Sequence, residues 1–224
     1  DLIVTADGSK SITKNKLNTP YFSFNYDQIC ITAKVLLRGV DSTNAFEIFN
    51  TEGPCAVLPL GGDIFQIICS QSKYNSVYNL SLPKSLFLDY LSTILPYGIE
   101  PDTLIDEPKP YPIKFLINCS FHSGKYIFLG ETSHTFHPVG GQGLNLCWRD
   151  VESLTKLISS PFLRNNKFLI PILYSFSRLV DVLSISFLTD FFVRYSRSNS
   201  YFFFAPRLFV FSILNKSKIA RNFI

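Results

Sequence analysis

The segment with the clearest capacity for chemistry is residues 126–150, YIFLGETSHTFHPVGGQGLNLCWRD. Its order predicts a strand, a short loop carrying the acidic Glu131, a glycine-rich turn and then a helix. A helix N-terminus offers unpaired N–H groups and the positive end of the helix dipole, and glycine lets a flat or anionic ligand approach the backbone. A carboxylate after a strand can accept hydrogen bonds from hydroxyl groups. The segment therefore suits a cofactor that has hydroxyls, phosphates and an electron-poor ring.

The elements that would position this segment are short strands followed by helices. Strand-like runs occur at residues 1–6, 26–38, 46–49, 55–60, 64–70, 113–119 and 125–129. Tight turns between such runs are typical of an antiparallel sheet. Residues 84–95 predict a short helix that ends before Pro96, and the proline-rich stretch 101–112 predicts a linker loop.

After Gly130 the pattern becomes helical, at about residues 144–159 and 171–195. The two patterns together predict an α+β fold. Charged residues interrupt the apolar C-terminal region, so we expect no segment to reach the roughly 20 apolar residues of a membrane-spanning helix. The run Tyr201–Phe204 predicts core or interface packing, or a surface for a membrane or polyprenyl tail, helped by the basic tail Lys216, Lys218 and Arg221.

Residues 130–145 resemble the second FAD fingerprint of the aromatic-ring hydroxylases related to p-hydroxybenzoate hydroxylase, usually written GDAAHxxxPxxGQGxN. The matching positions are Gly130, Glu131, His134, Pro138, Gly140 or Gly141, Gln142, Gly143 and Asn145. The resemblance implies that Glu131 binds the ribityl chain of FAD. Aspartate is usual there, and the extra methylene of Glu131 would shift the carboxylate by on the order of an ångström. The resemblance also implies that the turn Gly141-Gln142-Gly143-Leu144-Asn145 passes beside the isoalloxazine ring, where its N–H groups stabilise negative charge.

A second motif lies at residues 2–14, LIVTADGSKSITK, which resembles the DG motif of the same family, LLxxADGxxSxxR. Asp7, Gly8 and Ser11 match it. The resemblance implies contacts of Asp7 and Gly8 with FAD and with the NAD(P)H pyrophosphate. Lys10 and Lys14 keep a positive charge where arginine is usual, without the bidentate geometry of a guanidinium.

The resemblance extends over essentially the whole chain, and YDQICITAKV and EGPCAVLPL are similar to the hydroxylases of ubiquinone biosynthesis in particular. The family begins with a GxGxxG segment for the ADP half of FAD, which is absent from these 224 residues. The chain also has no methionine. We therefore interpret it as a fragment, the C-terminal portion of such an enzyme.

The expected fold is a partial p-hydroxybenzoate-hydroxylase-like FAD-binding fold with an antiparallel substrate-domain sheet and C-terminal helices. The expected parts are the DG-motif end of the FAD domain (1–20), the substrate-binding sheet (21–112), the FAD-contacting strand, loop and helix (113–160) and the C-terminal helical region (161–224). The resemblance implies an FAD-dependent monooxygenase that uses NAD(P)H and a flavin C4a-hydroperoxide to hydroxylate an aromatic ring. The implied substrate is a lipophilic phenol or quinone precursor, such as a polyprenylated phenol of ubiquinone-type quinone biosynthesis.

Two other functions stay open at this point. One is a flavoprotein of the same fold with another reaction, such as a geranylgeranyl-type reductase or a halogenase. The other is a non-catalytic, truncated remnant that binds only partners or a membrane. No protein nucleophile or general base stands out, so no catalytic residue is assigned. His134 favours a role in loop packing over one as a base, and the pair Arg149-Asp150 favours helix solvation or local ion pairing.

Charge and cysteine content limit the partners and the compartment. The net charge of +4 is scattered, which argues against a nucleic-acid partner. The spacing of His134, His137 and Cys147 matches no standard zinc site. The five cysteines form no CxxC pair, which favours reduced, buried thiols over a disulfide framework. We expect a cytoplasmic protein that associates peripherally with the membrane or with a quinone-synthesis complex.

Overall fold

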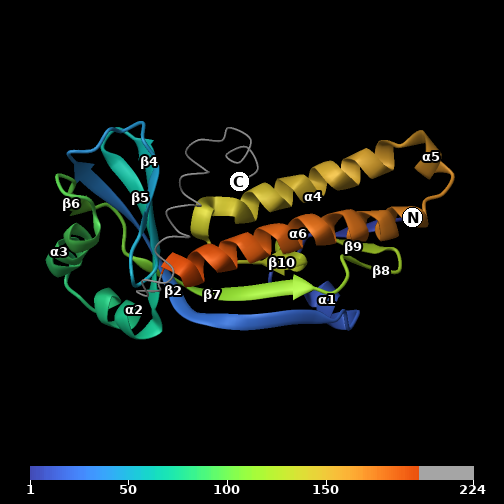
Figure 1. Cartoon of the computed structure of the whole chain (residues 1–224), viewed down its shortest axis with the longest axis horizontal. Helices are drawn as coiled ribbons and strands as arrows, with labels where there is room; N and C mark the ends of the chain where they lie inside the picture. Colours follow the sequence, from blue (N-terminus) through green and yellow to red (C-terminus); the bar gives the residue numbers. More distant parts are fainter. Residues whose placement is uncertain (197–224) are drawn as a thin grey trace.

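The computed structural model describes residues 1–196, and Figure 1 shows an elongated molecule with two lobes. The strand β2 (Tyr21–Arg38) runs through both lobes. It belongs to a seven-stranded sheet of order β10-β7-β2-β5-β4-β3, in which β6 also pairs with β2. A smaller three-stranded sheet has the order β1-β9-β8. The fold is α+β, as the sequence predicts.

The first lobe is a curled antiparallel sheet covered on one face by helices. It contains β3 (Phe46–Phe49), β4 (Pro54–Gly61), β5 (Ile64–Ser72), α2 (Lys73–Leu80), α3 (Lys84–Ile94) and β6 (Glu100–Leu104). Alternate strand residues such as Val57 and Ile67 pack with Phe87 and Leu91 of α3 in one core cluster. Because side chains alternate between the faces of a strand, Ala56 and Ile68 point to the opposite face. That opposite face forms part of the candidate site described below.

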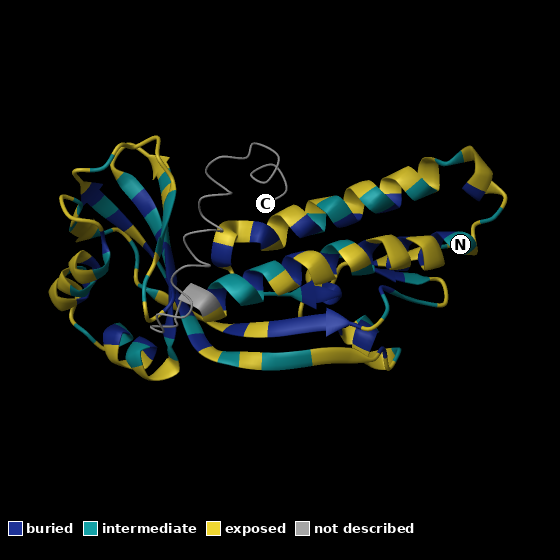
Figure 2. Cartoon of the chain, viewed as in Figure 1, coloured by how far each residue is buried: buried dark blue, intermediate teal, exposed yellow. Residues whose placement is uncertain are grey.

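The second lobe packs two long helices over the sheet formed by β7 (Lys109–Asn118) and the first half of β2. Its other elements are β1 (Ile3–Thr5), α1 (Ile12–Lys16), β8 (His122–Ser123), β9 (Tyr126–Phe128), β10 (His134–Thr135), the 3-10 turns η1 (Gly130–Thr132) and η2 (Val139–Gly141), α4 (Gln142–Ser159), α5 (Pro161–Arg164) and α6 (Leu169–Ser196). The buried residues of α4 are Gln142, Leu146, Asp150 and Leu154, one every fourth residue. This spacing places them on one helix face, and Figure 2 shows buried and exposed residues alternating along α4 and α6.

A bend in β2 separates the two lobes. The register between β2 and β7 shifts between Asn25 and Ile29, and Asp27 lies there with a positive φ of 53°. An irregularity of this kind bends and twists a strand locally. One strand can therefore contribute Phe24 and Tyr26 to the second lobe's core and Ile31 to the first lobe's core.

Most of the predicted elements are confirmed within a few residues. The strand at 46–49 matches β3, and the helix predicted at 84–95 is α3. The helices predicted at about 144–159 and 171–195 are α4 and α6. The prediction missed the shorter helices α1, α2 and α5. The run Tyr201–Phe204 and the basic tail lie outside the described residues.

The prediction of a linker loop over residues 101–112 was wrong. Pro101 lies in β6 opposite Leu37, and Pro110 and Pro112 lie in β7 opposite β2. Proline is tolerated on the outer edge of a sheet because a missing N–H there breaks no pairing. On its other side, β7 is paired with β10 only at Leu116 and Ile117, so the proline-containing half of β7 is an edge.

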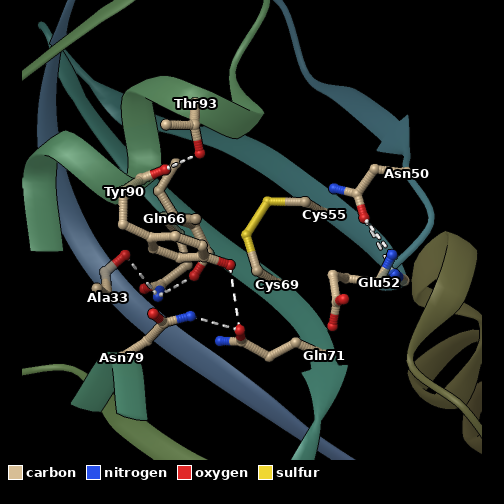
Figure 3. The surroundings of a disulfide bond; sticks show 12 residues. Ala33, Asn50, Glu52, Cys55, Gln66, Cys69, Gln71, Asn79, Tyr90 and Thr93 are labelled. Carbon is tan, nitrogen blue, oxygen red and sulfur yellow. Dashed lines mark hydrogen bonds between the residues drawn. A yellow bond between two sulfur atoms is a disulfide. The ribbon is translucent and has the colours of Figure 1, made fainter. Parts of the chain in front are cut away.

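The expectation of reduced thiols was wrong for two cysteines. Cys55 of β4 lies directly opposite Cys69 of β5, and the structure joins them by a disulfide (Figure 3). The sequence spacing did not reveal the pair because only strand pairing brings residues 14 apart to a Cα–Cα distance of 4.0 Å. The free cysteines are the buried Cys30, the half-buried Cys147 and the exposed Cys119.

The expectation that no segment reaches the length of a membrane span was also wrong. Within α6, Leu169–Arg194 is a 26-residue stretch that contains an 18-residue window with a mean hydropathy of 1.4, long and apolar enough to cross a membrane by length and composition. In this fold α6 packs against α4, and its Tyr174, Val182 and Ile185 belong to the core of the second lobe. Two of the charged residues of α6, Arg178 and Asp181, pair with α4.

Candidate functional site

A cavity of about 550 Å³ lies between the two lobes. One wall is the sheet face of β3, β4 and β5, and the other is the segment from Glu131 to Leu144. The wall residues are Ala45, Phe46, Glu47, Pro54, Ala56, Leu58, Ile68, Ser70, Glu131, His134, Thr135, Phe136, His137, Pro138, Val139, Gly140, Gly141, Gly143 and Leu144. The volume falls in the range of ordinary ligand sites, which occur preferentially between domains or lobes.

The cavity brings together part of the predicted site. Glu131, Pro138, Gly140, Gly141, Gly143 and Leu144 line it. The other predicted residues, Asp7, Gly8, Gly130, Gln142 and Asn145, are not among the lining residues. Asn145 donates to the Gln142 side chain over 3.3 Å, so these two residues support the first turn of α4. The predicted residues thus divide into a lining group and a supporting group.

The backbone of the glycine turn has a conformation that few other residues adopt. Gly140 and Gly141 have φ angles of 70° and 62°, in the left-handed region where a side chain is strained. Gly141 is the N-cap of α4, and no side chain caps that helix. Gly143 and Leu144, in the first turn of α4, therefore present N–H groups and the positive end of the helix dipole next to the cavity.

The Asp7-Gly8 turn, distant in sequence, is held by Thr132 against the loop that carries Glu131. Thr132 Oγ1 donates to Asp7 Oδ1 over 3.1 Å and accepts the Gly8 N–H over 3.1 Å. Burial would raise the pKa of Asp7, but hydrogen bonds from Ser11, Thr13 and Thr132 lower it to about 2. Asp7 is therefore an anion at neutral pH, hydrogen-bonded to the loop that carries Glu131.

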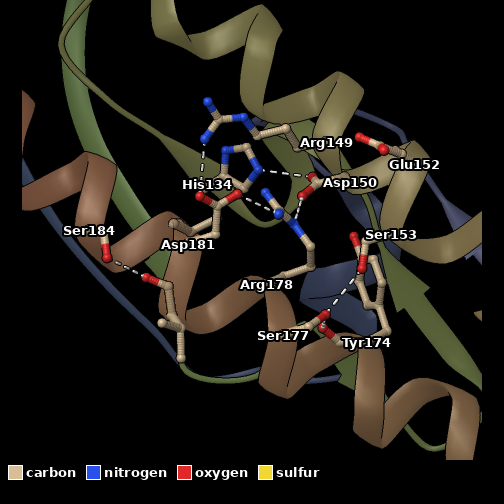
Figure 4. A network of polar contacts seen from close by, with 12 residues as sticks. His134, Arg149, Asp150, Glu152, Ser153, Tyr174, Ser177, Arg178, Asp181 and Ser184 are labelled. Atoms are coloured by element: carbon tan, nitrogen blue, oxygen red, sulfur yellow. Dashed lines mark hydrogen bonds and ion pairs between the residues drawn. The ribbon is translucent and has the colours of Figure 1, made fainter. Parts of the chain in front are cut away.

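Asp150 is a buried carboxylate that supports the loop from α4 (Figure 4). Its Oδ2 accepts the Gly130 N–H over 2.8 Å and lies 2.9 Å from Nε2 of the buried His134. Its Oδ1 accepts Nε of Arg178 over 2.6 Å. Burial would raise the pKa of Asp150, but His134, the Gly130 N–H and Arg178 hold it below the ordinary value. His134 therefore packs in the loop, as expected, with its Nε2–H directed at a carboxylate.

A second carboxylate extends this network across the two long helices. Arg178 donates through Nη1 to Asp181 over 2.5 Å, and Asp181 also accepts Arg149 of α4 over 3.1 Å. The interpretation of Arg149 as a local ion-pair residue is thus confirmed. For the fully buried Asp150, ion pairing also holds, through Arg178, and helix solvation does not. The sequence did hold a signal, because Asp150 falls between Leu146 and Leu154 on the apolar face of α4.

Glu47 is a further cavity residue that the sequence prediction missed. It lies in β3 opposite Ala56, and its carboxylate oxygens accept the Gly140 N–H over 3.1 and 3.3 Å. Burial raises the pKa of Glu47, and the bond from Gly140 offsets part of this effect. The sequence offered one signal for Glu47, because it is an acidic residue between Phe46 and Ile48 in a short apolar strand.

The residues present fit the flavin half of FAD. Glu131 lines the cavity, and among residues 1–196 no group donates a hydrogen bond to its carboxylate, which stays available for hydroxyl groups. The start of α4, at Gly143 and Leu144, offers N–H groups to an electron-poor ring edge. Within the same described residues, no cluster of three or more histidine, cysteine or acidic residues could hold a metal ion.

Comparison with known proteins agrees with an FAD site. Residues 1–164 match a family described as FAD binding domain. The uncharacterized protein slr1300 of Synechocystis is 30% identical over 159 residues, which cover 71% of this chain and 38% of that protein. The mitochondrial ubiquinone biosynthesis monooxygenase COQ6 of Caenorhabditis elegans is 27% identical over 194 residues, covering 70% of this chain and 43% of its own. The human COQ6 protein is 23% identical, covering 71% and 41%.

Solved structures share the fold at lower identity. The p-nitrophenol 4-monooxygenase PnpA from Pseudomonas putida DLL-E4 superposes with a TM-score of 0.73 at 16% identity, covering 99% of this chain and 57% of that one. The flavin-dependent halogenase CmlS superposes with a TM-score of 0.71 at 14% identity, covering 97% and 43%. These likenesses confirm the expected architecture, the fold of the p-hydroxybenzoate-hydroxylase type.

Proposed function

Because the chain belongs to the FAD-binding domain family related to the ubiquinone biosynthesis monooxygenases, we propose that it forms part of an enzyme that hydroxylates an aromatic ring. The proposed substrate is a polyprenylated phenol of ubiquinone-type quinone biosynthesis, and the proposed reductant is NAD(P)H. The chain spans 38% to 43% of the length of the curated relatives named above. The proposed activity is that of the whole protein, to which this chain contributes the cavity.

The observation that carries the proposal is the pairing of Glu131 with the glycine turn on one cavity wall. Glu131 would accept hydrogen bonds from the ribityl hydroxyls of FAD. The N–H groups of Gly143 and Leu144 in the first turn of α4 would stabilise negative charge on the pyrimidine edge of the flavin, since fixed dipoles stabilise charge without reorganisation. FAD, when bound, supplies the activation of dioxygen. The residues of this chain orient the ring system and exclude water.

The opposite wall supports an apolar, uncharged substrate. Ala45, Phe46, Ala56, Leu58 and Ile68 present aliphatic and aromatic surface to the cavity. A mostly apolar wall with few polar groups is typical of sites for small hydrophobic ligands. The names of the COQ6 relatives place them in ubiquinone biosynthesis, and this agrees with a lipophilic phenol as substrate.

Flavin content is the first test. The full-length protein is purified, and its visible absorbance spectrum and FAD stoichiometry are recorded, alongside those of residues 1–224 alone. We expect about one FAD per full-length protein and oxygen incorporation into a phenol with an apolar para substituent when NADH or NADPH is supplied. Incorporation of halide in place of oxygen would favour the halogenase reaction, because CmlS shares the fold.

A matched pair of variants connects the flavin to this cavity. Glu131→Ala should lower the FAD stoichiometry, while Glu152→Ala, which changes an exposed glutamate on α4, should not. Absence of FAD from the full-length wild-type protein would contradict the proposal and favour a non-catalytic remnant.

A further inference from the structure

Glu47 is placed to contact whatever aromatic ring lies between the sheet and the glycine turn. It projects from β3 in the cross-strand row Glu47–Ala56–Ile68, whose three members all line the cavity. Among residues 1–196 its only hydrogen-bond donor is the Gly140 N–H. A carboxylate has about four acceptor positions, so most of the acceptor capacity of Glu47 remains open toward the cavity.

The carboxylates of the cavity wall have no lysine or arginine beside them among the described lining residues. The described lining residues include two carboxylates, Glu47 and Glu131, and no lysine or arginine. A ligand carrying its own carboxylate would place a third negative charge in a half-buried, low-dielectric space, where like charges repel strongly. A neutral ligand with a hydroxyl group would instead supply the hydrogen-bond donor that Glu47 lacks. The wall thus favours hydroxyl groups over carboxylates.

We propose that Glu47 is the substrate-binding residue that accepts a hydrogen bond from the ring hydroxyl, so that the cavity selects neutral phenols and rejects aromatic carboxylates. This inference rests on the proposed function, because it assigns the sheet side of the cavity to the substrate and the Glu131 side to FAD. A carboxylate that accepts from a phenol also increases electron density on the ring. Glu47 therefore fixes the orientation of the ring and favours attack by its ortho and para carbons.

The test uses three ligands that differ at one group, namely para-pentylphenol, para-pentylanisole and para-pentylbenzoate. Each is titrated into the oxidised, FAD-loaded full-length protein without reductant, and binding is followed by the change in flavin absorbance. We expect the phenol to bind on the order of 10-fold more tightly than its methyl ether, since hydrogen bonds to charged groups contribute that much. The benzoate should bind more weakly than either.

Two substitutions separate hydrogen bonding from charge. Glu47→Leu removes the acceptor and should bring the affinity ratio of phenol to methyl ether close to one. Glu47→Gln keeps an acceptor oxygen but removes the charge, so it should retain part of the ratio and bind the benzoate more tightly than the wild type does. Glu152→Gln, on the exposed face of α4, is the control and should leave both ratios unchanged.

The outcomes distinguish this inference from the proposed function. If the full-length protein holds no FAD, the proposed function fails and the inference fails with it. If the protein holds FAD but the wild type binds phenol and methyl ether equally, or Glu47→Leu leaves the ratio unchanged, only the assignment of Glu47 is overturned. The affinity ratio is insensitive to a general loosening of the glycine turn, because such a change affects phenol and ether alike.

Discussion

Thr132 and Asp7 lie 125 residues apart in sequence, and their side chains form a hydrogen bond of 3.1 Å that joins the two predicted FAD motifs. The same Thr132 oxygen accepts the Gly8 N–H, so one hydroxyl group holds both sides of the Asp7-Gly8 turn. The residue types in the two motifs do not predict this contact. The relation between the motifs is therefore a property of the fold, and it can be tested by mutation.

Thr132→Val removes the hydroxyl while keeping the branched shape of the side chain. We expect a loss of about 0.5–1.5 kcal/mol in the free energy of unfolding, because the half-buried Gly8 N–H and the exposed Asp7 carboxylate each lose one hydrogen bond. The pKa of Asp7 should also rise from about 2, since Thr132 is one of the groups that lower it. Urea denaturation and an NMR titration of the Asp7 carboxyl measure the two effects. Thr93→Val, at the end of α3, should change neither quantity.

Asp150→Asn breaks the buried contacts of the carboxylate with Arg178 and His134. Leaving a buried arginine without its partner should cost about 3–5 kcal/mol of unfolding free energy at neutral pH. The pKa of Asp150 is lowered in the folded state. Its contribution to the free energy of unfolding is therefore present above the unfolded pKa and is lost as the pH falls through the folded pKa. The difference between wild type and variant should shrink in that acidic range. A loss under 1 kcal/mol at neutral pH would contradict the assigned role, and Glu152→Gln is the control on the same helix.

Gly130→Ala tests the turn that leads into the site. Gly130 has a φ of 58°, and a Cβ there would lie 3.0 Å from Sγ of Cys147. Gly124→Ala is a matched control, because Gly124 has a φ of 55° and no atom within 4 Å of the added Cβ. Both variants should lose about 1 kcal/mol through backbone strain, and Gly130→Ala should lose more. Adding Cys147→Ala to Gly130→Ala should recover part of that excess, as thermal unfolding would show.

Glu47→Gln tests the cost of holding a carboxylate at the cavity wall. The pKa of Glu47 is raised in the folded state, which means that the fold favours the neutral carboxyl group. The stabilisation of the folded state by this group is complete below the unfolded pKa and is lost as the pH rises through the folded pKa. The glutamine variant should therefore unfold at a higher temperature than the wild type at pH 7, and this difference should close near pH 4. Glu107→Gln, an exposed glutamate paired with Lys84, should show no such pH-dependent gain. A Gln variant less stable than the wild type at pH 7 would show that the Gly140 contact outweighs the burial of charge.

The sequence predicted the local elements well where a strong hydrophobic pattern coincides with turn residues, as in β3 and α3. It failed for the strands that contain Pro101, Pro110 and Pro112, because proline is compatible with a strand only at a sheet edge, and edges are set by which strands pair. It failed for Cys55 and Cys69 for the same reason. Their pairing depends on the register of β4 and β5, and not on their spacing along the chain.

By itself, the sequence determined the α+β class, the family and the segment from Gly130 to Asn145, because backbone demands such as a left-handed turn before a helix require particular residues at fixed spacing. The tertiary structure alone decided which side chains meet this segment. Thr132 reaches Asp7, Asp150 reaches Gly130, and Glu47 crosses from the other lobe to Gly140. Such contacts depend on strand register and helix packing over distances of up to 125 residues, and no local pattern of residue types encodes them.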